Sequence, residues 1–234
     1  MVAEPNKLRM IVGLHDLAEP ADARGDELLS WMPFTEVSVL LDRLAQNTRR
    51  NGIALEITSD DAFRSDYELL VPWLLERRLA ATFFVPTRFV GQPGRLTVAR
   101  LREMAGLGMT IGVHGARHID WARAGHDAFV EDLREGREAL QQMLGAPVDR
   151  VAPPFGGYDG PIVARLTAEG FREIHTCRPG LALAGEALKP RNMIKRGAVE
   201  AVLAMSHRRG GPRDALRCRL RRLRAGLHFL GVRA

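Results

Sequence analysis

The sequence lacks several features that would place it in a specialised class of protein. Its 234 residues include only two cysteines, Cys177 and Cys218, so it has no disulfide framework. No apolar run approaches the roughly 18 residues that a membrane span needs, and the first residues show no apolar segment of a secretory signal. We therefore expect a cytoplasmic protein. Its hydrophobic content of 46% and charged content of 26% are typical of one globular domain.

Positive charge is spread unevenly along the chain. The net charge is +6, but the arginines are concentrated between residues 208 and 233, where leucines recur on one helical face. We predict a main domain over residues 1–207 and a basic amphipathic helix over residues 208–234. The helix could lie on the inner face of an anionic membrane, or pack on the domain with its basic face in water. We expect no nucleic-acid partner, because the basicity belongs to this segment alone.

Short apolar segments alternate with segments of helical periodicity. This alternation predicts an α/β fold with a parallel sheet, either a closed barrel or an open doubly wound sheet. The expected strands cover residues 9–14, 53–58, 81–86, 109–114, 150–153, 172–177 and 188–194, and the expected helices cover residues 34–50, 65–78, 97–107, 126–144 and 159–169.

Polar residues gather where the predicted strands end. Asp60 and Asp61 follow one strand, His114 closes another, and His15 follows the first. Because α/β folds build their sites at the carboxyl ends of parallel strands, these side chains are candidates for a common site.

His114 and His118 form an H-x-x-x-H pair that, on a helix, would present two imidazoles to one metal ion. With one carboxylate they would make a three-ligand site that leaves room for water. Of the adjacent pair Asp60 and Asp61, one could bind the metal while the other acts as a base. Alternatively, the segment 58–61 simply caps the next helix.

Four ordered motifs resemble the NodB-homology polysaccharide deacetylases, the family-4 carbohydrate esterases. They are D-D at 60–61, A-T-F-F-V at 81–85, G-V-H-G-A-R-H at 112–118 and A-P-P-F-G-G-Y-D at 152–159. The resemblance implies a distorted (β/α) barrel of the NodB-homology type. It also implies a metal-dependent hydrolase of carbon–nitrogen bonds other than peptide bonds. Its substrate would be an N-acetylated amino sugar in a polysaccharide, an oligosaccharide or a lipid-linked sugar, which fits exopolysaccharide biosynthesis.

The resemblance also assigns roles to residues. Asp61, His114 and His118 would be the metal ligands, and Asp60 would be the catalytic base. Zinc is the favoured ion for such ligands, with cobalt, nickel or iron as alternatives.

The same resemblance suggests how the sugar is held. Pro154 and Phe155 would line the groove for the sugar. Trp121 follows the histidine motif closely and could stack on a sugar ring.

The family's general acid is a histidine in a late L-x-H-type motif, which has no good match here. His207 is a poor candidate, and Leu14-His15-Asp16 matches better. A histidine motif at the start of the domain resembles the order in poly-N-acetylglucosamine deacetylases. We therefore favour His15 as the general acid, against the alternative of a loop residue hydrogen-bonded to Asp16.

Three residues depart from the family pattern. Ser59 replaces an aromatic residue, Ala62 replaces a glycine, and Ala152 replaces an arginine that orients the base. Arg191, also a candidate substrate contact, could supply that charge instead. These departures keep two alternatives open: another amide hydrolase on the same scaffold, such as a deformylase, or a catalytically weak glycan-binding relative.

Overall fold

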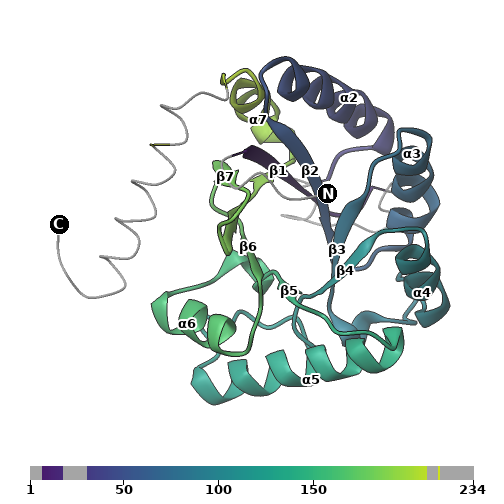
Figure 1. Cartoon of the computed structure of the whole chain (residues 1–234). Coiled ribbons are helices and arrows are strands. Elements are labelled where there is room, and N and C mark those ends of the chain that lie inside the picture. The colour runs from purple at the N-terminus through teal and green to yellow at the C-terminus, as the bar shows by residue number, and fades with distance from the viewer. Residues whose placement is uncertain (1–6, 18–30, 210–215, 217–234) are drawn as a thin grey trace.

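The computed structural model describes residues 7–17, 31–209 and 216 of the chain (Figure 1). The predicted basic helix over residues 208–234 lies outside the described residues, apart from Arg208, Arg209 and Leu216. Across the described part of the chain, every helix is too short or too polar to cross a lipid bilayer.

The strands form a single curled sheet that nearly closes on itself. Its order is β7-β1-β2-β3-β4-β5-β6-β8, with β9 pairing to β1. From β1 to β6 each strand lies parallel to the next, as the strand–helix alternation predicted, whereas β7 runs antiparallel to its neighbour β1. The strands are β1 (Leu8–Leu14), β2 (Ala54–Asp60), β3 (Ala81–Val85), β4 (Thr110–Val113), β5 (Arg150–Val151), β6 (Glu173–Thr176), β7 (Leu181–Leu183), β8 (Leu188–Pro190) and β9 (Asn192–Met193).

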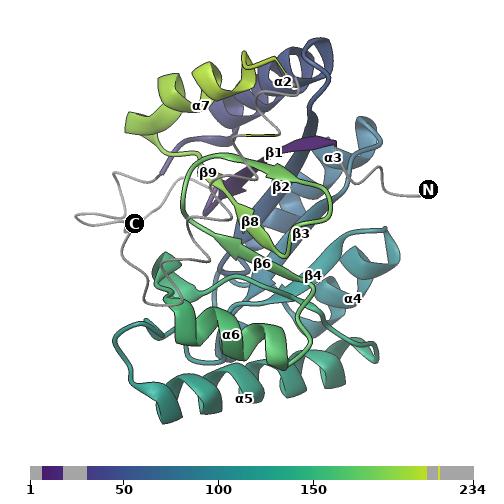
Figure 2. The ribbon, with the colours of Figure 1, turned by 60° about the vertical axis from the view of Figure 1, so that its left-hand side comes forward.

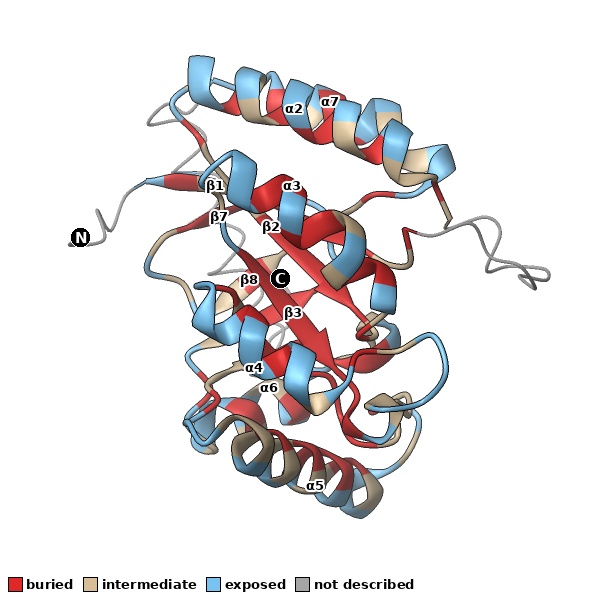
Figure 3. Ribbon diagram, turned by 90° about the vertical axis from the view of Figure 1, so that its right-hand side faces the viewer, coloured by how far each residue is buried: buried red, intermediate tan, exposed pale blue. Residues whose placement is uncertain are grey.

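Helices surround the barrel and bury their apolar stripes against its outer face (Figures 1 and 3). Side-chain caps mark where two of these helices begin: Thr97 caps α4 and Asp159 caps α6 through their side-chain oxygens, as expected for N-cap residues. The helices are α2 (Phe34–Arg50), α3 (Val71–Glu76), α4 (Val98–Gly106), α5 (His126–Leu144), α6 (Gly160–Ala168) and α7 (Val199–Ser206), with a π-helical turn η1 (Asp66–Leu70) before α3.

Two short strands close the barrel at a seam. β8 pairs with β6, while β9 pairs with β1 (Figure 2). Only Arg191 separates β8 from β9, so this residue stands where the two ends of the sheet meet. The nearly closed sheet confirms the barrel and excludes the open-sheet alternative.

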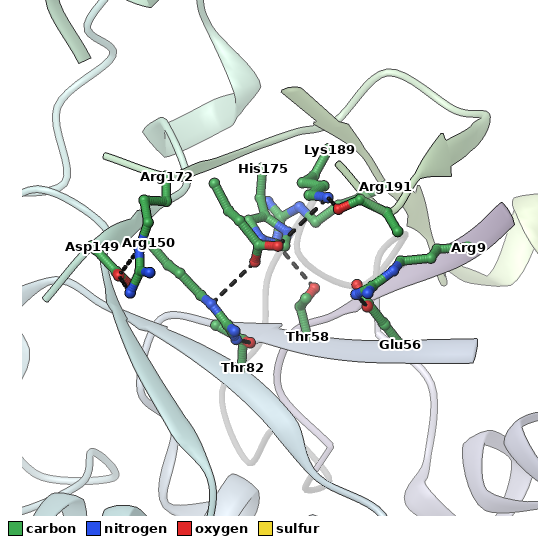
Figure 4. A network of polar contacts seen from close by, with 12 residues as sticks. Arg9, Glu56, Thr58, Thr82, Asp149, Arg150, Arg172, His175, Lys189 and Arg191 are labelled. Carbon is green, nitrogen blue, oxygen red and sulfur yellow. Dashed lines mark hydrogen bonds and ion pairs between the residues drawn. The ribbon is translucent and has the colours of Figure 1, made fainter. Parts of the chain in front are cut away.

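Side chains alternate between the inside and the outside of the barrel. In β2, Ile57 packs outward in the core, while Glu56, Thr58 and Asp60 take the inward positions. The inner side is polar: Arg150 contacts Thr82 and Glu173, and Lys189 contacts Glu173 (Figure 4). Because the apolar core therefore lies between sheet and helices, the barrel interior is free to carry charged groups.

The helix expected over residues 65–78 and the strand expected over residues 188–194 are each divided in two, and two other elements were missed. The expected helix over residues 65–78 is split into η1 and α3, because Pro72 has no N–H to donate within a continuous helix. β7 and α7 were missed since both are short. α7 packs on α2, where Asn47 Nδ2 donates to Ser206 Oγ at 3.0 Å.

Candidate metal centre and active site

Two adjacent aspartates at the end of β2 point in different directions. Asp60 is the last residue of the strand, whereas Asp61 and Ala62 turn back with φ angles of 73° and 54°. Residues other than glycine rarely adopt this left-handed conformation, which costs about 1 kcal/mol or more per residue. Backbone hydrogen bonds hold the turn, with Asp61 N donating to Phe84 O at 3.0 Å and Leu96 N donating to Ala62 O at 2.8 Å.

Asp61, His114 and His118 come together at this turn. Asp61 Oδ1 lies 3.6 Å from His114 Nε2 and 3.2 Å from His118 Nε2, and one ligand atom from each residue lies within 4.8 Å of the others. The same Oδ1 is buried and accepts no hydrogen bond from any described residue. A buried carboxylate oxygen without a hydrogen bond is costly, so these three residues fit a divalent metal ion.

The tautomer of His114 suits this role. His114 follows β4, and its Nδ1 lies 2.7 Å from the carbonyl oxygen of Ala152. Because a carbonyl only accepts hydrogen bonds, Nδ1 must carry the proton, which leaves the lone pair of Nε2 facing Asp61. Ala152, where the family pattern has an arginine, thus contributes through its backbone.

His118 reaches the same point from a loop. The helical geometry considered for the H-x-x-x-H pair is wrong, since His118 lies outside the helices with a φ of 57°. Its ring packs between those of Phe155 and Phe89, with centroids 4.6 and 5.7 Å away. Burial, followed by the nearby His114, lowers the pKa of His118, which favours the neutral imidazole that binds metals.

A buried aspartate on α5 organises the loop between the two histidines. Asp132 is fully buried; its Oδ1 accepts from Arg117 N at 2.8 Å, and its Oδ2 accepts from Trp121 Nε1 at 2.9 Å. Trp121 is only 2% exposed, so it packs in the core and offers no ring face to a sugar, contrary to the sequence-based prediction. Sequence reasoning missed Asp132, although it falls on the apolar stripe of its helix three residues after Phe129.

Asp60 is paired with a buried arginine from the seam. Arg191 Nη1 donates to Asp60 Oδ1 at 2.6 Å, and Nη2 donates to Oδ2 at 2.9 Å. Burial alone would raise the pKa of Asp60, but the Arg191 guanidinium, together with His114 and His15, holds that pKa well below its usual range. Arg191 is 0% exposed. Arg191 is therefore not the predicted substrate contact. It is a partner of Asp60, which is the other role considered from the sequence.

The two candidate general acids lie at opposite ends of the barrel. His15 follows β1 at the end where β2 reaches Asp60, and its charge contributes to lowering the pKa of Asp60. His207 Nε2 instead lies 3.3 Å from Asn47 Nδ2 near the end of α2. The chain passes from α2 into the first residue of β2, so His207 lies at the end of the barrel where β2 begins. This placement leaves His15 as the candidate near the site.

The predicted groove residues differ in exposure. Pro154 is buried, while Phe155 is 68% exposed with a φ of 57°. The Phe155 ring therefore presents one side to His118 and remains open to solvent at the mouth of the site. An exposed aromatic ring beside the metal ligands suits stacking on a sugar.

Ser59, which stands where the family pattern has an aromatic residue, has a polar partner that the sequence did not predict. Its hydroxyl donates to Asp66 Oδ1 at 2.6 Å, and both residues are fully buried. Burial is the main cause that raises the pKa of Asp66 well above its usual range. Burial therefore favours the neutral form of Asp66, which lies on the outer side of the barrel wall with Ser59, and the Ser59 side chain points away from the proposed ligands.

Comparison with known proteins places the chain in a family. A family model described as polysaccharide deacetylase matches residues 47–174. The chain belongs to the polysaccharide deacetylase family. Within that match lie the aspartate pair, both histidines and Phe155, whereas His15 and Arg191 lie outside it. The membership suggested by the four motifs is thus confirmed.

Individual polysaccharide deacetylases are distant in sequence. YxkH of Bacillus subtilis (strain 168) is 22% identical over 139 residues, which are 59% of this chain and 50% of YxkH. The chain therefore spans half the length of that relative.

Solved structures show the shared fold. IcaB from Ammonifex degensii has a TM-score of 0.72 at 20% identity, over 86% of this chain and 98% of IcaB. Streptococcus pyogenes deacetylase PplD, solved with acetate, has a TM-score of 0.69 at 19% identity, over 85% and 96%. These likenesses confirm the NodB-type barrel.

Proposed function

We propose that this deacetylase-family protein hydrolyses the N-acetyl group of an amino sugar with a divalent metal ion. The observation that carries the proposal is the group formed by Asp61, His114 and His118, with Asp60 next to it and paired with Arg191. The family match and the acetate found in the PplD structure support acetate as the product.

The chain's residues divide the work. Asp61, His114 and His118 would hold the ion, which supplies a Lewis acid at the acetamide carbonyl. Asp60 takes a proton from the attacking water, and the bidentate contact with Arg191 keeps its carboxylate ionised and fixed in plane. His15, when protonated, donates to the leaving amine. Phe155 stacks on the sugar.

Zinc is the ion we propose, because two imidazoles and one carboxylate form a common zinc site, although cobalt, nickel and iron fit similar ligands. The motif order shared with poly-N-acetylglucosamine deacetylases makes N-acetylhexosamine polymers the first substrates to test. It also supports a role in exopolysaccharide biosynthesis. Lipid-linked sugars come next. The cytoplasmic location stays a prediction.

Acetate release from N-acetylhexosamine oligomers tests the proposal, together with metal analysis of the purified protein. We expect zinc-dependent release by the wild type and a loss of at least about 100-fold in Asp60→Asn, with the metal still bound. Asp42→Asn, a surface aspartate on α2, is the matched control and should keep full activity.

Three outcomes would contradict the proposal. Wild-type turnover in Asp60→Asn with metal bound removes Asp60 as the base. Release of formate without acetate identifies another amide hydrolase. Sugar binding without bound metal identifies a glycan-binding relative.

A further inference from the structure

The loop between β3 and α4, residues 86–96, contacts both turns that carry the proposed metal ligands. We call it the bridge loop. On one side, Thr87 N donates to Gly115 O at 3.3 Å and Arg88 N donates to Ala116 O at 3.0 Å. These bonds join the loop to the segment between His114 and His118.

On its other side, the bridge loop holds the aspartate turn. Leu96 N donates to Ala62 O at 2.8 Å, and Gly94 O accepts from Arg64 N at 2.9 Å. Phe63 and Arg95 also form an antiparallel bridge. The bridge loop therefore holds the turn at Asp61 and Ala62, in which both residues adopt the left-handed conformation.

Among the hydrogen bonds of the described residues, Arg95 is the one residue of the bridge loop whose side chain reaches the backbone carbonyl of a proposed ligand. Its Nη1 donates to Asp61 O at 2.9 Å. Its guanidinium lies 3.8 Å from the ring centroid of Phe63 and 4.8 Å from that of Phe89. A planar guanidinium stacks on aromatic rings while donating in its own plane, so both contacts can be made together.

Through Phe89, Arg95 also connects to the second ligand turn. The Phe89 ring packs on the imidazole of His118, with the centroids 5.7 Å apart. Arg95 thus contacts the Asp61 backbone on one side and the ring that supports His118 on the other. Its role would not be visible in the sequence, since residue 95 lies in a loop between two family motifs.

We propose that Arg95 is a positioning residue: it holds the left-handed turn at Asp61 and Ala62 and, through Phe89, sets the spacing of Asp61 and His118 for the metal ion. The inference rests on the proposed function, because it assumes that these side chains bind a metal. Partners outside the ligand set commonly change metal affinity by about 10- to 100-fold when they are removed.

Zinc titration of metal-free protein tests the role of Arg95. We expect Arg95→Gln to bind zinc at least about tenfold more weakly than the wild type. We also expect an altered visible absorption spectrum of the cobalt-loaded form. Arg64→Gln is the matched control, because Arg64 lies one residue beyond Phe63 with its side chain 67% exposed. It should leave both readouts unchanged.

Two further variants separate positioning from general stability. Arg95→Lys keeps the charge but loses the planar stack, so zinc binding should weaken although the metal-free protein unfolds at a wild-type temperature. In an Ala62→Gly background, Arg95→Gln should cost less affinity, because glycine adopts the left-handed turn without strain.

The outcomes distinguish this inference from the proposed function. If the wild type binds zinc and Arg95→Gln binds it equally well, Arg95 does not position the ligands. If Arg95→Gln lowers zinc affinity equally in the wild-type and the Ala62→Gly backgrounds, Arg95 does not act through the turn. If the wild type itself binds no divalent metal, the proposed function fails as well.

Discussion

Two buried carboxyl groups on either side of the β2 strand have pKa values shifted in opposite directions because their partners differ. Asp60 faces the barrel interior and receives two hydrogen bonds from the Arg191 guanidinium, so its pKa is held low. Asp66 packs behind the strand, where its Oδ1 receives only the Ser59 hydroxyl and its buried Oδ2 accepts from no described residue. A buried acid without a cation is more stable when neutral.

Asp66→Asn should therefore remove a pH dependence of stability. The folded-state pKa of Asp66 is raised above its unfolded value. Its contribution is thus fully present below the unfolded pKa and is lost as pH rises toward the folded pKa, by about 1.4 kcal/mol per pH unit. Asparagine mimics the neutral acid, so urea unfolding at pH 4 and pH 7 should show the variant gaining stability relative to wild type at pH 7. An equal difference between variant and wild type at both pH values would mean that Asp66 is ionised in the folded protein.

At the scale of elements, the long helices were predictable and the loops that complete the site were not. The boundaries of α2 and α5 match the predicted ranges, because periodicity over several turns specifies a helix. The sequence also brought Asp60, Asp61 and His114 to one end of the barrel, since each follows a parallel strand. The contacts of Arg95, the burial of Trp121 and the pairing of Ser59 with Asp66 depend on loop geometry and on packing between distant segments. No local pattern encodes these.

Helix α5 approaches the histidine loop so closely that it needs a glycine. A Cβ at Gly136 would lie 2.6 Å from the carbonyl carbon of Gly115 and 2.8 Å from its oxygen. We expect Gly136→Ala to displace the loop that carries His118, to lower the free energy of unfolding by about 1–3 kcal/mol and to weaken zinc binding.

Thermal unfolding and zinc titration measure both effects. Gly106→Ala on α4 is the control, because its Cβ would meet no atom within 4 Å; it should be neutral or stabilising by about 0.5–1 kcal/mol. Wild-type zinc affinity in Gly136→Ala would show that α5 does not fix the loop.

At the scale of the whole molecule, the barrel brings together residues from the entire described chain. The site takes Asp61 from the turn after β2, His114 from the residue after β4 and Arg191 from the seam, while His15 follows the first strand. The contact with anionic membranes predicted for the basic segment over residues 208–234 stays a prediction, because most of that segment lies outside the described residues.

Vesicle sedimentation tests that contact. We expect the full chain to bind vesicles rich in phosphatidylserine and not neutral ones, because each arginine near such a surface contributes about 1 kcal/mol. Binding should fall as salt rises. A variant with Arg217, Arg219, Arg221 and Arg222 changed to glutamine should bind far less. Equal binding of both proteins to neutral and anionic vesicles would contradict the prediction.

The position of Arg191 between β8 and β9 has a consequence for how the protein matures during synthesis. The chain leaves the ribosome from its first residue onward, so Asp61, His114 and His118 emerge well before Arg191 does. Until β8 and β9 dock, Asp60, the proposed base, lacks the two hydrogen bonds from the Arg191 guanidinium. The pairing of the proposed base therefore requires that β8 reach β6 and β9 reach β1, so the activity proposed here would depend on a completed barrel.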